Sequence, residues 1–350
     1  MASAISDPAL EVLFLPFAHN VLPQSGTESL FLRARGGGAM QRMETGSLLC
    51  EQSFKPAADV LQQQGFRTVA DVDASPKRYP HVLVLPPRQR EEARALFARA
   101  VTLAAPGGRV IASIENNEGA KAGEGDLKRL AGLGGSLSKH HCRVFWTGPI
   151  GDGDHALLAQ WRELDAPRPI LQGRYVSRPG VFSWNRIDPA SALLARNLPT
   201  TLGGDGADLG TGFGYLADEV LTRCPGVRSL DVYEAESRAL ALARINLSRH
   251  SQRVQLQYHW ADVTSGLDRA YDFIVSNPPF HSQGRDGRPD IGQGFIAAAA
   301  AALMRGGRLW LVANKHLPYE DVLKQRFSDI RLVDMDQGFK VIEAIKAGPR

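Results

Sequence analysis

The sequence is poor in cysteine and in long apolar runs. Its 350 residues include three cysteines, Cys50, Cys142 and Cys224, which are odd in number and far apart. Neither a disulfide framework nor a paired-cysteine metal site is therefore expected, and we predict no metal. No apolar run reaches the roughly 18 residues that a membrane-spanning helix needs, and the amino terminus lacks the basic and apolar segments of a secretory signal. These features predict a soluble protein of the reducing cytoplasm, with no membrane partner.

A strong excess of charge of one sign is also absent. The net charge of +4 and the isoelectric point of about 9.0 are compatible with a polyanionic partner, but a surplus this small does not identify one. Hydrophobic residues make up 43% of the chain, which is enough to build the cores of two domains of ordinary size.

Apolar strand-like runs alternate with helical patterns along most of the chain, which is typical of an α/β fold. Near the amino terminus we expect short strand-like segments at residues 12–17 and 29–35. The glycines of Arg35-Gly36-Gly37-Gly38 lack the strand, loop and helix setting of a phosphate loop, so we interpret them as a turn.

One order of motifs occurs twice in the chain. The segment RYPHVLVLPPR at 78–88 aligns with AYDFIVSNPPF at 270–280, and LAAPGGRVIASIEN at 103–116 aligns with ALMRGGRLWLVANK at 302–315. Each copy has a strand, a double proline, a helix, a Gly-Gly pair and a second strand. We infer an internal duplication, which predicts two tandem Rossmann-like domains.

The expected domain boundaries follow from this duplication. Residues 1–165 form the first domain, the proline-containing and basic segment 166–180 is the linker, and residues 181–350 form the second domain. The first copy has Leu85 and Arg88 where the second has Asn277 and Phe280, so we expect the first domain to be degenerate. The second copy also contains additional polar and glycine-rich residues directly after its double proline, where specificity is often built.

Asn277-Pro278-Pro279-Phe280 follows a predicted buried strand at residues 271–276. Two consecutive prolines cannot continue a strand ladder, so the chain must leave the sheet there in an extended conformation. The Asn277 amide and the Pro278 carbonyl oxygen can then accept hydrogen bonds from a planar NH2 group, and Phe280 can stack on a ring. Taken alone, the motif is more often a simple strand-terminating turn.

The segment Asp208-Leu209-Gly210-Thr211-Gly212-Phe213-Gly214 ends another short strand and precedes a predicted helix at residues 215–222. Its glycines let a ligand approach the backbone, and the helix start offers free N–H groups. A nicotinamide dinucleotide site must be considered. However, the third glycine follows the second by two residues rather than three, so the dinucleotide fingerprint is not met. An acid before the glycines suits a cationic amino-acid ligand better than a pyrophosphate.

Three further acids lie at ends of predicted elements. Glu234 follows a strand predicted at 229–233, and a carboxylate at that position can accept hydrogen bonds from both hydroxyls of a ribose. Asp262 follows the next strand and can accept from an adenine amino group, with a solvated turn acid as an equal alternative. Asp188 precedes a helix predicted at 190–198, and we interpret it mainly as the N-cap of that helix.

In this order, DLGTGFG, Glu234, Asp262 and SNPPF resemble the class I S-adenosylmethionine-dependent methyltransferases whose NPP motif serves exocyclic or amide nitrogens. A closer resemblance is to the tandem-domain ribosomal RNA small subunit (16S rRNA) guanine-N2 methyltransferases, whose amino-terminal domain has lost its catalytic motif. The segments that carry it are PGVFSWNRIDPASALL before the glycine loop and VANKHLPYEDVL and FKVIEAIKA near the carboxyl terminus. The specific likeness covers residues 179–346, and the likeness of residues 1–165 is loose.

The resemblance implies a cofactor, S-adenosylmethionine, and a partner, ribosomal RNA or the small ribosomal subunit, for a chain expected to be a monomer. Asn277 and the Pro278 carbonyl would accept from the guanine amino group, and Phe280 would stack on the base. The cofactor's methionine end, ribose and adenine would be held by Asp208, Gly210, Thr211, Gly212, Gly214, Glu234 and Asp262, with Asn277 adjoining. Candidate phosphate contacts are Arg244, Arg249, Arg253, Arg285 and Arg288.

Several alternatives remain at this point. A large-subunit ribosomal RNA guanine-N2 methyltransferase of the same tandem type would use the same motifs, as would enzymes that methylate adenine N6 or a glutamine amide. A non-catalytic RNA-binding assembly factor is an alternative of another class. The last is disfavoured because the second copy keeps every cofactor position that the first has lost.

Overall fold

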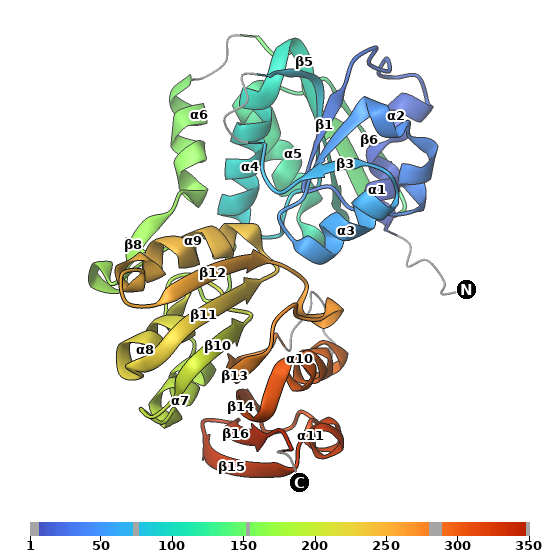
Figure 1. Ribbon diagram of the computed structural model, residues 1–350. Helices are drawn as coiled ribbons and strands as arrows, with labels where there is room; N and C mark the ends of the chain where they lie inside the picture. Colours follow the sequence, from blue (N-terminus) through green and yellow to red (C-terminus); the bar gives the residue numbers. More distant parts are fainter. Residues whose placement is uncertain (1–6, 73–76, 152–154, 280–288, 348–350) are drawn as a thin grey trace. The chain divides into compact units, whose positions relative to one another are not determined.

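The computed structural model describes residues 7–72, 77–151, 155–279 and 289–347. The chain divides into two compact units, Met1–Ala166 and Pro167–Arg350. Each unit is built around its own seven-stranded sheet (Figure 1).

The two sheets have the same topology. The strand orders are β3-β2-β1-β4-β5-β7-β6 in the first unit and β12-β11-β10-β13-β14-β16-β15 in the second. In both, the first five strands of this order pair in parallel and the remaining pairings are antiparallel. The predicted fold of two tandem Rossmann-like α/β domains is therefore confirmed.

The elements of the first unit alternate between strands and helices. Its strands are β1 (Ser29–Leu32), β2 (Leu48–Glu51), β3 (Arg67–Val69), β4 (Tyr79–Val84), β5 (Ala104–Glu115), β6 (Gly135–Lys139) and β7 (Cys142–Trp146). Its α-helices are α1 (Pro8–Leu13), α2 (Leu15–Ala18), α3 (Lys55–Gln63), α4 (Arg90–Leu103), α5 (Ala120–Ala131) and α6 (His155–Arg162).

The second unit begins with a small antiparallel ladder of β8 (Arg168–Ile170) and β9 (Tyr175–Ser177), which lies in the segment expected to be a linker. Its main strands are β10 (Gly203–Leu209), β11 (Gly226–Glu234), β12 (Gln255–Trp260), β13 (Tyr271–Ser276), β14 (Leu303–Asn314), β15 (Asp329–Asp336) and β16 (Phe339–Ile345). Its α-helices are α7 (Pro189–Asn197), α8 (Tyr215–Arg223), α9 (Ser237–Leu247), α10 (Pro289–Ala302) and α11 (Glu320–Arg326).

Helices cover both faces of the second sheet (Figure 1). Apolar residues of α7, α8 and α9 pack against one face, which includes Leu230 and Val232. Residues of α10 and α11 pack against the other face, which includes Leu209 and Ile274. A parallel sheet covered on both sides favours apolar residues in its central strands, as in β13, where Phe273, Ile274 and Val275 are buried.

One sequence expectation is wrong. Residues 12–17 are not strand-like but lie in the short helices α1 and α2. Asp7 caps α1 by accepting a hydrogen bond of 3.0 Å from the Leu10 N–H, and Pro8 occupies the first helical position. The buried residues Ala9, Leu10, Val12 and Leu13 follow helical spacing. A short apolar run cannot be assigned to strand or helix without such flanking signals.

Asp218 on α8 holds three segments of the second unit together. Its fully buried carboxylate accepts hydrogen bonds from the Tyr175 hydroxyl (2.7 Å) and the Arg249 guanidinium (2.6 Å), and lies 2.8 Å from His250 Nε2. Burial raises the pKa of this carboxyl, but these partners outweigh it and keep the pKa below its usual range. The network fixes α8 and β9 relative to each other.

Replacing Asp218 should therefore destabilise the fold strongly. We expect Asp218→Ala to lower the free energy of unfolding by about 3–5 kcal/mol, because it leaves a buried tyrosine hydroxyl and an arginine without their anion. Urea denaturation of the full chain measures this. The exposed Asp268 provides the matched control, since Asp268→Ala should change the free energy by less than about 0.5 kcal/mol. Equal losses in the two variants would contradict the role of Asp218.

Candidate functional site

The strand order places two distant motifs side by side. β10 and β13 pair in parallel, with Leu209 opposite Ser276, so Gly210 and Asn277 begin neighbouring loops at the same edge of the sheet. The helices that follow, α8 and α10, cover opposite faces. A crevice at such a reversal of strand order is where open α/β sheets bind ligands.

The glycine loop has the backbone that its sequence predicts. Gly210, Gly212 and Gly214 have positive φ values of 77°, 58° and 96°. Gly214 directly precedes α8, and a Cβ atom there would lie 3.3 Å from the Ala243 backbone in addition to the strained φ. Glycine therefore suits the sharp turn at these positions, most strongly at Gly214, where both φ and the Ala243 backbone disfavour a side chain.

Asp208 lies beneath this loop and is 1% exposed. Its Oδ2 accepts a hydrogen bond of 2.7 Å from the Thr211 hydroxyl, whereas its buried Oδ1 has no partner in the described part of the chain. Burial raises the pKa of Asp208 to about 7, although the Thr211 hydrogen bond acts in the opposite direction. Asp208 is therefore a buried acceptor with unused capacity for a cationic group.

Glu234 ends β11 and holds the glycine loop. Its Oε2 accepts from the Gly212 N–H at 2.8 Å, and its Oε1 accepts from the Glu236 N–H at 2.9 Å. Burial raises the pKa of Glu234, and these backbone hydrogen bonds counter the rise in part. Each carboxylate oxygen retains a second lone pair for a ligand hydroxyl.

Asp262 follows β12 at the same edge of the sheet. Its Oδ1 accepts from the Thr264 N–H (2.9 Å) and the Thr264 hydroxyl (2.7 Å), so it caps the short 3-10 helix Val263–Ser265. The side chain is partly exposed. Asp262 is therefore a capping acid of this turn, which was one of the two predicted roles. Its Oδ2 is still able to accept a hydrogen bond from a ligand.

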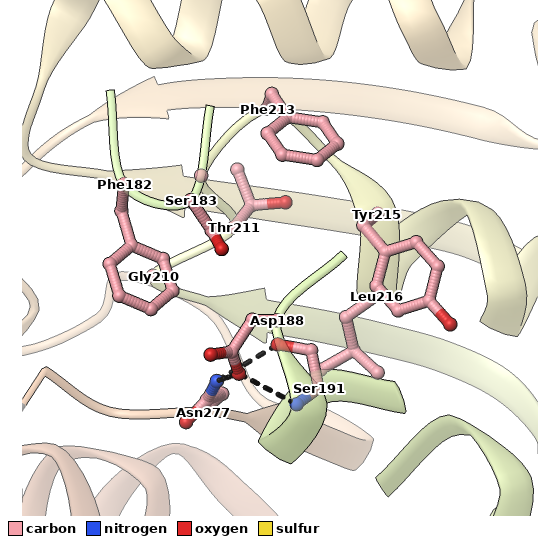
Figure 2. A pocket seen from close by; sticks show the side chains of 11 residues that line it. Phe182, Ser183, Asp188, Ser191, Gly210, Thr211, Phe213, Tyr215, Leu216 and Asn277 are labelled. Atoms are coloured by element: carbon pink, nitrogen blue, oxygen red, sulfur yellow. Dashed lines mark hydrogen bonds between the residues drawn. The ribbon is translucent and has the colours of Figure 1, made fainter. Parts of the chain in front are cut away.

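Asn277 adopts one specific orientation. Its Nδ2 donates to Asp188 Oδ2 at 2.9 Å and to Ser191 Oγ at 2.8 Å, and Figure 2 shows the amide nitrogen directed at both. Asp188 Oδ2 also accepts from the Ser191 N–H at 2.9 Å and so caps α7, as predicted. Pro278 is buried beside Asn277. Phe280 lies outside the described residues.

A pocket opens between the glycine loop, the start of α7 and Asn277 (Figure 2). Its lining residues are Phe182, Ser183, Asp188, Ser191, Gly210, Thr211, Gly212, Phe213, Tyr215, Leu216 and Asn277. Phe182 is 64% exposed, and Ser183 has a positive φ of 52°, which is uncommon outside glycine.

The sequence reasoning assigned no site role to Phe182, Ser183 or Ser191. All three lie in the segment PGVFSWNRIDPASALL, which carried the family resemblance, and this was the available signal. Asp188 was assigned mainly to capping, yet the structure brings it into contact with Asn277 as well.

Most of the candidate phosphate-binding arginines are engaged within the chain. Arg249 binds the buried Asp218, and Arg253 donates to the carbonyl oxygens of Leu221 and Pro225. The Arg244 guanidinium lies over the Tyr258 ring, 4.3 Å from its centroid, and combines a cation with an aromatic face. Arg285 and Arg288 lie outside the described residues.

The same edge of the first sheet carries different side chains. Because Leu32 lies opposite Val84 as Leu209 lies opposite Ser276, the strand registers align the two copies residue by residue. Extending this alignment to the neighbouring strands of each sheet gives the equivalent residues of the two units. Arg33 is equivalent to Gly210, Gln52 to Glu234, Val72 to Asp262 and Leu85 to Asn277.

Gln52 illustrates how the first copy has changed. Its Oε1 accepts from the Phe54 N–H at 2.9 Å, as Glu234 accepts from Glu236, but its Nε2 donates to the Ala34 carbonyl oxygen at 2.6 Å. The amide keeps the loop in place without a carboxylate. Leu85 and Val72 are buried apolar residues, so this edge lacks the acceptors of the second copy.

The strand order, the glycine loop before α8 and the Asn-Pro-Pro turn after β13 define a class I methyltransferase. The family model described as "Methyltransferase small domain" matches residues 172–343. Over 98% of its length the chain has the fold of the T. thermophilus 16S rRNA N2 G1207 methyltransferase in complex with AdoMet and guanosine, with a TM-score of 0.78, 24% identity and 93% of that chain covered.

The more specific relationship comes from sequence. The chain is 30% identical to the ribosomal RNA small subunit methyltransferase C of Shewanella piezotolerans over 77% of its own length and 78% of the relative. It is 29% identical to the protein of that name from Psychromonas ingrahamii, over 77% of this chain and 76% of the relative. The chain belongs to the ribosomal RNA small subunit methyltransferase C family, which confirms the predicted family.

The described residues show neither a membrane-spanning helix nor a cluster of metal ligands. None of their helices has the length and apolar character that crossing a bilayer would require. Among these residues, no three His, Cys, Asp or Glu side chains are gathered as metal ligands would be.

The buried Asp208 makes the stability of the chain depend on pH. Between about pH 4 and pH 7 the unfolded chain has an ionised Asp208 while the folded chain keeps it protonated. Raising the pH through this window should therefore destabilise the fold, by at most about 1.4 kcal/mol per pH unit. The isosteric Asp208→Asn variant keeps an acceptor for Thr211 and should lack this contribution. Denaturation of both proteins across the window measures the difference, and parallel pH curves would contradict it.

Proposed function

We propose that the chain transfers a methyl group from S-adenosylmethionine to the exocyclic N2 amine of a guanine in 16S ribosomal RNA of the small subunit. The observation that carries the proposal is Asn277, whose Nδ2 donates both of its hydrogens to Asp188 and Ser191, so that its Oδ1 is the atom that would accept from a ligand. The shared family, whose members are named for small-subunit ribosomal RNA, supports the substrate.

The residues of the second unit fit the cofactor. Asp208 Oδ1, a buried acceptor without a partner in the described part of the chain, and the open backbone of Gly210 and Gly212 suit a cationic amino-acid moiety. Glu234 would hold the ribose hydroxyls and Asp262 the adenine amino group, in the order in which β10, β11 and β12 lie in the sheet. When bound, S-adenosylmethionine supplies an electrophilic methyl group on its sulfonium.

The chemistry of the chain's own residues is mainly positioning. Asn277 Oδ1 and the Pro278 carbonyl would accept the two N–H groups of the guanine amine and direct its lone pair at the methyl group. In the transfer, a bond from N2 to the methyl carbon would replace the carbon–sulfur bond, S-adenosylhomocysteine would leave as a neutral thioether, and the nitrogen would lose its extra proton to water. Both acceptors favour the positive charge that develops on nitrogen. Phe280, outside the described residues, would stack on the unpaired base.

We further propose that the chain acts as a monomer in the cytoplasm. Cys50, Cys142 and Cys224 are buried and unpaired, which fits a reducing compartment. The large-subunit alternative would use the same geometry, whereas the non-catalytic alternative gives no role to the buried Asp208 Oδ1, which has no partner in the described part of the chain.

The first unit would have a structural or RNA-binding role rather than a cofactor site, with residues 1–165 as the degenerate domain, 166–180 as the linker and 181–350 as the catalytic domain. Four changes support this: Gly210 is replaced by Arg33, Glu234 by Gln52, Asp262 by Val72 and Asn277 by Leu85. An arginine in the glycine position, here with a positive φ of 51°, puts a side chain where the cofactor loop must be open.

Asn277→Ala should lose methyl transfer. We expect the rate constant to fall by about 100-fold to 1,000-fold, as when a preorganised hydrogen-bonding group is removed from a reaction centre. Labelled methyl transfer to small subunits lacking their own modifications, with the product nucleoside identified by mass, measures it. N2-methylguanosine should form with the wild type.

The exposed Asn116 offers a control of the same residue type, and Asn116→Ala should keep the wild-type rate. If the label appeared on large subunits or on protein instead, the proposed substrate would be wrong, but the proposed site would still stand. A lack of transfer to any acceptor would favour the non-catalytic alternative.

Each chain should bind one molecule of S-adenosylmethionine. Removing the carboxylate in Glu234→Ala should weaken binding by about 10-fold to 100-fold, since hydrogen bonds to charged groups contribute about 1.5–3 kcal/mol. Gln52→Ala, at the equivalent position of the first unit, should leave the affinity unchanged. Isothermal titration calorimetry gives both the stoichiometry and the affinities. Two sites per chain, or weaker binding in Gln52→Ala, would show that the first unit is a cofactor domain.

A further inference from the structure

The start of α7 controls which atom Asn277 can present to the pocket. Both N–H bonds of its amide are used, one by Asp188 Oδ2 at 2.9 Å and one by Ser191 Oγ at 2.8 Å. An ionised carboxylate can only accept hydrogen bonds, so the amide nitrogen must face Asp188 and the oxygen must face away from it. Figure 2 shows these three side chains together at the wall of the pocket.

This orientation matters because a primary amide has two different ends. A half-turn of the Asn277 amide would exchange its oxygen for an NH2 group and place a donor where the guanine amine also offers donors. A site that must bind an NH2 group therefore needs the amide fixed in one of two orientations of similar shape. Preorganisation of this kind lowers the cost of reaching the transition state.

We propose that Asp188 and Ser191 are positioning residues that lock the Asn277 amide with its oxygen toward the acceptor nucleotide, and so set the site to accept an amino group. The proposal rests on the proposed function for its consequence in catalysis. The Asp188 charge also polarises the amide through the shared hydrogen bond and strengthens Oδ1 as an acceptor.

The internal duplication separates this role from helix capping. The first unit contains the same cap, since Asp7-Pro8-Ala9 begins α1 as Asp188-Pro189-Ala190 begins α7, and Asp7 accepts from the Leu10 N–H. However, Leu10 stands at the place of Ser191 and Leu85 at that of Asn277. Both units therefore have the capping aspartate, but only the second unit has the serine and the asparagine that contact each other.

The two residues that replace Ser191 and Asn277 in the first unit are both apolar and buried. Leu10 and Leu85 are 1% and 3% exposed and belong to one apolar cluster. A serine–asparagine pair in the second unit thus corresponds to a leucine–leucine pair in the first. Capping alone requires only the aspartate and the backbone N–H of the third helical residue, so it does not explain why Ser191 is polar.

Ser191→Ala tests the lock without disturbing the cap, because the cap uses the Ser191 backbone N–H rather than its hydroxyl. With the full chain and small-subunit substrate, we expect kcat to fall by about tenfold, a loss typical of slight misplacement of a reacting group, with KM for S-adenosylmethionine and the melting temperature unchanged. In the Asn277→Ala background the same change should have no further effect on kcat. Independent, multiplicative effects of the two substitutions would overturn the proposal.

Variants at Asp188 separate charge, contact and cap. Asp188→Asn keeps an oxygen that can accept from both Asn277 and the Ser191 N–H, so it should retain more activity than Asp188→Ala. Asp188→Ala loses the cap as well and should lower both kcat and the melting temperature. Asp7→Ala removes the equivalent cap in the first unit and should lower the melting temperature while leaving kcat unchanged. Equal kcat in Asp188→Ala and Asp7→Ala would contradict a positioning role.

A measurement without substrate distinguishes failure of this inference from failure of the proposed function. The side-chain amide of Asn277 can be identified in a ¹⁵N–¹H correlation spectrum as the pair of signals that Asn277→Ala removes. Its protons should exchange with water at least about tenfold more slowly in the wild type than in Asp188→Ala, since hydrogen bonding protects them. Protection that depends on Asp188 supports the lock even where no methyl transfer is found. Equal exchange in the two proteins would overturn it.

Discussion

The parallel pairing of β10 with β13 is the constraint on which the rest of the second unit depends. It sets Leu209 opposite Ser276, although the two residues are 67 positions apart in the sequence. The glycine loop and the Asn-Pro-Pro turn therefore start side by side at the same edge of the sheet. The Ser276 hydroxyl donates to the Leu209 carbonyl at 2.8 Å and ties the two strand ends together. Because α8 and α10 then diverge to opposite faces, a pocket forms without any insertion into the fold.

The duplication shows which parts of this arrangement are structural. The first unit keeps the strand order, the double proline and the capping aspartate, all of which serve folding. It has lost the side chains that face the pocket in the second unit, and the replacements keep the backbone geometry. Gln52 makes the same hydrogen bond to the residue two positions on as Glu234 does, with the charge removed. The scaffold is thus the same in both units, although the side chains at this edge of the sheet differ.

The cap of α7 and the contact with Asn277 meet at Asp188. One carboxylate oxygen closes the first turn of α7 and also receives the Asn277 amide, and α7 is anchored by Leu193 and Leu194, which are buried against the sheet. The Asn277 amide is consequently held by the first turn of a packed helix rather than by a loop. Ser191, in the first turn of the same helix, supplies the second acceptor for this amide.

The sequence by itself determined the fold class, the duplication and the family, because double prolines, glycine spacing and apolar strands are local signals. The strand predicted at Tyr271–Ser276 is reproduced to the residue, whereas the strand predicted at 29–35 ends at Leu32. The sequence reasoning assigned residues 12–17 wrongly, since a short apolar run has no period of its own. Only the tertiary structure decided that Asp188 and Ser191 meet Asn277, because that contact spans more than 80 residues and depends on how α7 packs on the sheet. The free capacity of Asp208 and the internal engagement of Arg249 and Arg253 were likewise settled by packing, which no local pattern records.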